Sequence, residues 1–177
     1  MESIKKLLRL LFLFPIVAYG QTVHIDDDRI VYKGTVKVGQ ISKDNLYESV
    51  KQAIYDNVSR SKKNTLLDDK TNGRIAVKGK MKLTTPYHLV RTVGFLLEVV
   101  VDDGGYKYRI DSVYMVQVER GGKTIKARSG DVYKGIEATG PESVEAEKIV
   151  NEIDLKFQKM LVLIKSDIRK EEVAQSK

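Results

Sequence analysis

Two pairs of adjacent acidic residues are the first candidates for chemistry in this chain. The pairs are Asp68-Asp69 and Asp102-Asp103. Hydrolysis of a glycosidic bond uses two carboxyl groups that face each other across the bond. Adjacent residues of a strand point to opposite faces, and each pair lies beside a glycine-containing turn signal. The two pairs therefore predict turns rather than a catalytic dyad.

The histidines and the absence of cysteine give no further candidate for a catalytic or metal-binding residue. The chain has two histidines, His24 and His88, which are far apart in the sequence, and it has no cysteine. A metal site needs three or four converging ligands. The sequence contains neither a Gly-x-Ser-x-Gly elbow nor a phosphate-binding P-loop. We therefore expect no catalytic residue, no cofactor and no metal site, and we expect that the protein is not an enzyme.

Tyrosines and basic residues in the second half of the chain predict a binding surface instead. Tyrosine presents a large apolar ring with a polar group, and lysine and arginine attract anionic lipids or glycans. The candidate surface for a ligand or partner consists of Tyr106, Tyr108, Tyr114, Lys123, Lys126 and Arg128. In the alternative interpretation, the tyrosines pack between the sheet and its helices and the basic residues belong to a solvated loop.

The first twenty residues have the pattern of a secretory signal peptide. Lys5, Lys6 and Arg9 precede an apolar run over residues 10–18, and Ala18-Tyr19-Gly20 gives a small-x-small cleavage site. The run is about half the ~20 residues that cross a bilayer. We expect cleavage after Gly20 and a periplasmic or secreted protein. It would be no lipoprotein, because no cysteine follows the signal, and the mature chain would have no transmembrane segment.

Composition and charge indicate an ordinary globular domain. The chain has 177 residues and a formal net charge of +7, with acidic residues interspersed throughout. This pattern and the expected export argue against a nucleic-acid partner. We divide the chain into a signal peptide (1–20), a polar lead-in (21–29), a single α+β domain (30–168) that includes a basic irregular segment (120–141), and a charged tail (169–177).

Hydrophobic periodicity predicts the elements of this domain. Alternation over residues 30–38 indicates a strand, and apolar residues at intervals of four after Ser42 indicate a helix to about Arg60. Asn72-Gly73 and Asp103-Gly104 predict hairpin turns, and a change of phase near Asp111-Ser112 predicts a bulge. A long helix is expected from Pro141. This order favours an α+β fold, an antiparallel sheet of about four to five strands with two helices packed on one face.

Two blocks of the sequence resemble a known family. One is the strand and helix start Gly34-Thr-Val-Lys-Val-Gly-Gln-Ile-Ser-Lys-Asp-Asn-Leu-Tyr47, and the other is the turn and strand Asp68-Asp-Lys-Thr-Asn-Gly-Arg-Ile-Ala-Val-Lys-Gly79. With the signal peptide, they resemble exported proteins of Bacteroidota that carry the domain of unknown function 4468. The resemblance covers roughly residues 30–118. It implies a fold like that of the TATA-binding protein, with a curved antiparallel sheet that carries helices, and it transfers no catalytic residue.

These observations favour one function over two others. We expect a non-catalytic binding or interaction module of the cell envelope, whose partner is an envelope protein, a lipid or a glycan. The alternative is an assembly component that pairs through its long carboxy-terminal helix. An uncharacterised enzyme is the least favoured.

Overall fold

The computed structural model describes residues 22–26, 29–39, 41–84, 90–118, 124–128 and 141–175. His88, Lys123 and the expected signal peptide lie outside these residues. Within them, no helix is both long enough and apolar enough to cross a membrane.

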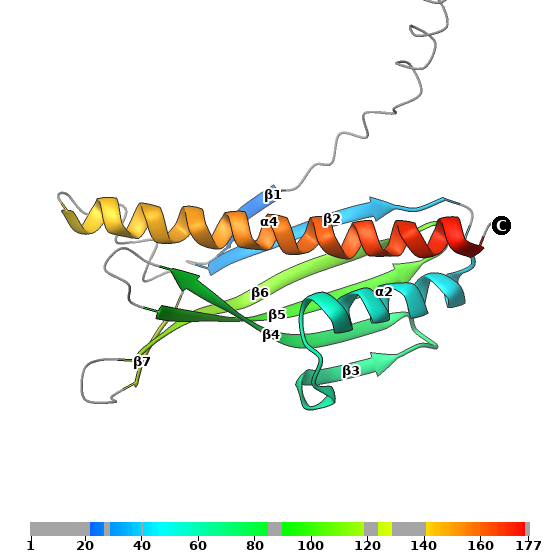
Figure 1. Ribbon diagram of the computed structural model, residues 1–177, viewed down its shortest axis with the longest axis horizontal. Helices are drawn as coiled ribbons and strands as arrows, with labels where there is room; N and C mark the ends of the chain where they lie inside the picture. The colour runs from blue at the N-terminus through cyan, green and yellow to red at the C-terminus, as the bar shows by residue number, and fades with distance from the viewer. Residues whose placement is uncertain are drawn as a thin grey trace, which may run out of the picture.

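The described chain forms one antiparallel sheet that carries two long helices on a single face (Figure 1). The helices are α2 (Lys43–Asn57) and α4 (Pro141–Gln175), and a short 3-10 helix spans Lys62–Asn64. The strands are β1 (Thr22–Asp26), β2 (Arg29–Lys37), β3 (Thr65–Asp69), β4 (Arg74–Thr84), β5 (Val90–Asp102), β6 (Gly105–Val118) and β7 (Thr124–Arg128). Their order in the sheet is β1-β2-β6-β5-β4-β3, and β7 also pairs with β6.

The expected architecture is confirmed, although the sheet is larger than expected. The described residues form seven strands rather than four or five. The difference comes from the five-residue strands β1, β3 and β7: β1 and β7 alternate between polar and apolar residues over five positions only, and β3 does not alternate. Part of the segment expected as a polar lead-in forms β1, which pairs with β2, and part of the segment expected to be irregular forms β7. Helix α4 also extends into the expected charged tail, as far as Gln175.

Local signals in the sequence account for the helix start and for the turns. The backbone N–H of Asn45 donates to the Ser42 hydroxyl at 3.4 Å, which caps the first turn of α2. Gly73 and Gly104 have φ angles of +67° and +74°, which close the β3–β4 and β5–β6 hairpins. The predicted helix cap at Ser42 and the two predicted hairpin turns are therefore confirmed.

The core lies between the sheet and the helices. The apolar stripe of α4 is buried there. The centroid of its Phe157 ring lies 4.8 Å from the ring centroid of Tyr32 and 5.0 Å from that of Phe95. From α2, residues Leu46 and Val50 are fully buried in the same core. Both helices cover one face, so the residues that the structure describes place no helix on the opposite face.

Candidate functional site

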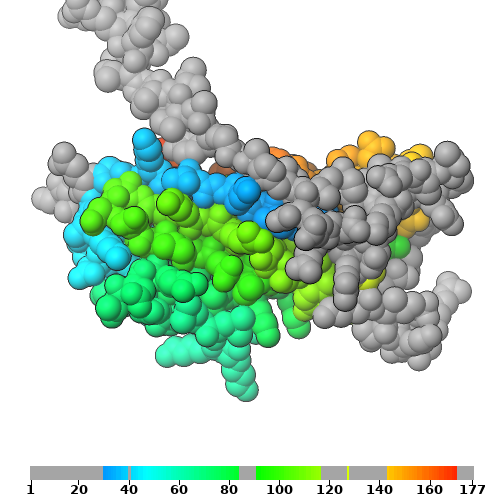
Figure 2. All heavy atoms as spheres, turned by 180° about the vertical axis from the view of Figure 1, so that it is seen from behind, coloured from blue at the N-terminus to red at the C-terminus, as the bar shows by residue number. Residues whose placement is uncertain are grey.

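The face of the sheet opposite α2 and α4, called the open face below, is the candidate site (Figure 2). Strand residues alternate between the two faces. In β4, the inward side chains of Ile75 and Val77 are buried, whereas the outward Lys78 and Lys80 are exposed. Cross-strand register extends this assignment from β4 to β5, β6 and β2.

The open face is strongly basic. Its exposed basic side chains are Lys33, Lys37, Arg74, Lys78, Lys80, Lys82, Lys107 and Arg109. Among its acidic residues, Asp111 forms an ion pair with Arg109 at 2.9 Å, and Asp69 accepts from the turn residue Asn72. Sequence reasoning missed this surface as a site, although lysine at every second position of 78–82 was a visible signal.

The structure separates the three predicted tyrosines. Tyr106 and Tyr108 lie on the helix face and are 4% and 9% exposed, so they belong to the core and not to the candidate surface. Tyr114 lies opposite Gly94 on the open face and is partly exposed. Tyr106 and Tyr108 thus follow the alternative interpretation, in which tyrosines pack beneath the helices.

The bulge in β6 causes this separation. Ser112 has a φ of 51°, and the β5–β6 register shifts between Gly94 and Leu96. The extra residue reverses the alternation, so that Val113 and Met115 are buried while Tyr114 faces outward. The predicted bulge is therefore confirmed, and its consequence for the tyrosines follows only from the structure.

The three predicted basic residues can be placed only in part. Lys123 lies outside the described residues. Lys126 and Arg128 belong to β7, where they occupy the register positions opposite Val116 and Tyr114 of β6. Arg128 is thus the register partner of Tyr114, and Lys126 lies opposite Val116, two residues further along β6.

A shallow pocket of about 180 Å³ lies on the open face between β3 and β6. Leu67, Ala76 and Val100 contribute apolar surface to it. Its basic neighbours are Arg74, Lys107 and Arg109, and Glu98 is the acidic one. An anionic partner with a small apolar group fits this combination.

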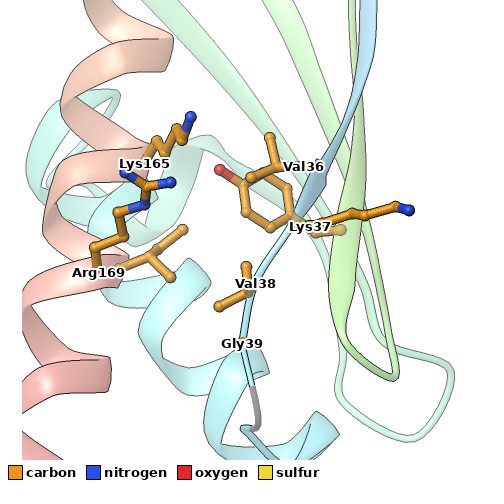
Figure 3. A pocket seen from close by; sticks show the side chains of 8 residues that line it. Val36, Lys37, Val38, Gly39, Lys165 and Arg169 are labelled. Carbon is orange, nitrogen blue, oxygen red and sulfur yellow. The ribbon is translucent and has the colours of Figure 1, made fainter. Parts of the chain in front are cut away.

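A second, smaller pocket of about 80 Å³ lies between the end of β2 and α4 (Figure 3). Lys165 and Arg169 reach from α4 toward Val36 of β2, whereas Lys37 points away from the pocket. Its lining also includes the buried Tyr106. This pocket has room for a few water molecules or a small anion, but not for a polymer.

Residues 32–115 match the model of a family described as "Domain of unknown function (DUF4468) with TBP-like fold". The chain carries a DUF4468 domain. No curated protein matches the chain. The DUF4468 resemblance inferred from the sequence is therefore confirmed over β2 to β6.

Two crystal structures share the fold of this DUF4468 chain. A TBP-like protein from Parabacteroides distasonis ATCC 8503 aligns with a TM-score of 0.61 and 10% identity, over 81% of this chain and 97% of that one. A DUF4468 family protein from Bacteroides ovatus ATCC 8483 aligns with a TM-score of 0.54 and 15% identity, over 80% of this chain and 90% of that one. At these identities the likeness shows the fold alone.

The acidic pairs of the DUF4468 domain stabilise its structure. The buried Tyr47 donates its hydroxyl to Asp68 at 2.7 Å, and Lys51 pairs with the same carboxylate at 2.7 Å. The hydrogen bonds from Lys51 and Tyr47 hold the pKa of Asp68 below its usual value, while burial and the bond to Asp68 raise the pKa of Tyr47. Asp102 accepts from the backbone N–H of Asp103. Asp69 and Asp102 thus accept from turn residues, as the sequence predicted, whereas Asp68 joins β3 to α2.

Proposed function

We propose that this protein is an exported, non-catalytic binding module whose open face binds an anionic partner in the cell envelope. The concentration of exposed basic side chains on that face carries the proposal. Residues two apart on a strand lie roughly 6.8 Å from each other, within the Debye length of about 8 Å at physiological salt. Their fields therefore add, and the whole face attracts anions.

The burial of the helix stripe favours this proposal over assembly through α4. The apolar positions of the stripe are covered by the rest of the domain: Ala146, Ile149, Ile153, Phe157, Met160, Ile164 and Ile168. Leu155 and Val162 nevertheless remain 66% and 64% exposed on the other side of the helix. Because these two apolar side chains are exposed, pairing with another chain through α4 is the second candidate function.

Co-sedimentation of the mature protein with a cell-envelope fraction tests the proposal. The test variant is Lys33→Gln/Lys80→Gln/Lys107→Gln, which removes one charge from each of three strands. A lysine near an anionic surface contributes about 1 kcal/mol, so binding should weaken roughly a hundredfold. The charge-matched control on α4 is Lys148→Gln/Lys159→Gln/Lys170→Gln, which should bind as the wild type does.

The two candidate functions give different results in this experiment. Binding through the open face should weaken as salt rises, and the α4 control should not affect it. If the open-face variant sediments like the wild type, the proposal is wrong. A Leu155→Ala/Val162→Ala variant that alone abolishes binding would support the helix instead.

A further inference from the structure

Strand β4 places three lysines in a line along the open face. Lys78, Lys80 and Lys82 are all exposed. Successive members lie about 6.8 Å apart along the strand. Across β5 they register with the uncharged residues Leu96, Gly94 and Thr92. Among the described residues, none of the three lysines has a carboxylate partner within ion-pair distance.

Such a line of like charges is unfavourable for the isolated domain. Neighbouring lysines on one face of a strand repel one another, and the uncharged residues of β5 do not compensate. A ligand with negative charges spaced along an extended chain would relieve this repulsion at every position. The line of lysines therefore fits a linear polyanion better than a single small anion.

Tyr114 adds an aromatic surface beside the lysines. A Cβ atom built on Gly94 would overlap the Tyr114 ring, with Cε1 at 2.6 Å, so the ring lies over the glycine. Gly94 in turn registers with Lys80, which gives one row across the sheet: Lys80 of β4, Gly94 of β5 and Tyr114 of β6. The register position of Arg128 on β7 continues this row.

We propose that Lys78, Lys80, Lys82 and Tyr114 form a subsite for an acidic polysaccharide that lies along β4. The carboxylates of the polysaccharide would pair with the lysines, and a sugar ring would pack on the exposed side of Tyr114. This inference rests on the proposed function, because it names the anionic partner of the open face and the place where it binds.

The same residues argue against two other anionic partners. Single-stranded nucleic acid is bound by several aromatic rings that stack successive bases. Of the aromatic side chains that the structure describes, Tyr114 is the one on the open face. A bilayer takes up apolar side chains that protrude from the protein. Beside the lysine line, the outward apolar residues Leu96 and Val116 are only partly exposed.

Titration of the mature protein with polygalacturonate, a carboxylated linear glycan, tests the inference. Isothermal titration calorimetry should show binding that weakens with salt, and neutral dextran should not bind. Lys78→Gln/Lys80→Gln/Lys82→Gln should lower the affinity at least tenfold. Lys148→Gln/Lys159→Gln/Lys170→Gln on α4 should leave the affinity unchanged.

Tyr114 needs a pair of variants because its ring also covers Gly94. Tyr114→Phe keeps the ring and should bind nearly as well as the wild type. Tyr114→Leu removes the aromatic surface and should lose affinity severalfold, with thermal unfolding measured to verify that it folds. Equal affinity of the wild type and Tyr114→Leu would remove Tyr114 from the subsite and overturn this inference.

Other outcomes separate this inference from the proposed function. Unchanged affinity in the β4 variant, or equal binding of dextran, would overturn the polysaccharide subsite. Tighter binding of anionic phosphatidylglycerol vesicles or of single-stranded DNA through the same lysines would also overturn it, while an anionic partner for the open face would still hold. If none of these polyanions nor the envelope fraction binds, both proposals fall.

Discussion

The ring of Phe95 on β5 lies over Gly79 on β4. A Cβ atom at position 79 would overlap the ring, with Cε1 at 2.6 Å. Phe95 also packs edge-on against Phe157 of α4, with ring centroids 5.0 Å apart and an interplanar angle of 90°. Gly79 thus makes room for an aromatic contact that joins the sheet to the long helix. Gly34 and Gly94 make the same kind of room for Tyr108 and Tyr114.

Gly79→Ala should therefore destabilise the domain. The added methyl group displaces the Phe95 ring, and overpacking of a core typically costs about 1–3 kcal/mol. Denaturant unfolding measures this loss as a lower midpoint at an unchanged slope. In a Phe95→Leu background the same substitution should cost less, because the ring is gone. Equal costs in the two backgrounds would contradict the interpretation.

Gly73 and Gly104 form a matched pair for turn geometry. Both have φ near +70°, where an alanine costs roughly 1–2 kcal/mol. At Gly73 a Cβ would also overlap the backbone carbonyl of Val101, whereas at Gly104 nothing lies within 4 Å. Gly73→Ala should therefore lower the free energy of unfolding by more than Gly104→Ala does. A larger loss at Gly104 would contradict this reading of the two turns.

The lowered pKa of Asp68 predicts an acid-sensitive contact between β3 and α2. In the unfolded chain an aspartate titrates near 3.9, and in the fold its pKa is lower. Its stabilising contribution is therefore complete above the unfolded pKa and disappears as the pH falls through the folded one. Asp68→Asn should lower the melting temperature at pH 7 and show a smaller further decrease between pH 5 and pH 3 than the wild type. If the melting temperatures of the variant and the wild type fall equally between pH 5 and pH 3, Asp68 contributes nothing to the acid sensitivity.

The two sides of α4 should respond differently to truncation. Phe157 is fully buried between Tyr32 and Phe95, so Phe157→Ala should cost about 3–5 kcal/mol. Leu155 on the same helix is 66% exposed, and Leu155→Ala should change stability by less than about 0.5 kcal/mol in the monomer. Chemical denaturation at several protein concentrations checks both values. A large, concentration-dependent cost at Leu155 would instead show that α4 pairs with another chain.

The expected signal peptide predicts a defined amino terminus for the mature protein. After expression in a bacterium with a secretory pathway, the protein outside the cytoplasm should begin at Gln21, as read by intact mass. Ala18→Arg should block cleavage, because the small residue three positions before the cut is lost. Recovery of an intact chain that begins at Met1 in the cytoplasm would contradict the expected signal peptide.

The sequence by itself determined the longer elements and two of the turns between them. Period-two alternation in β2 and β4, the stripes of α2 and α4, the Ser42 cap and the turns at Gly73 and Gly104 are local signals that need only neighbouring residues. The bulge near Ser112 was also visible, as a change of phase. These features, with the family resemblance, were enough to predict the fold class.

Only the tertiary structure decided which residues share a face and which of them meet. The pairing of β2 with β6 joins segments some seventy residues apart, and no local pattern encodes it. Whether Tyr106 or Tyr114 faces outward depends on the single extra residue at Ser112, since one residue of shift exchanges the two faces of a strand. The basic open face exists because α2 and α4 pack on the other side of the sheet, which leaves the exposed lysines of β2, β4 and β6 together on one face.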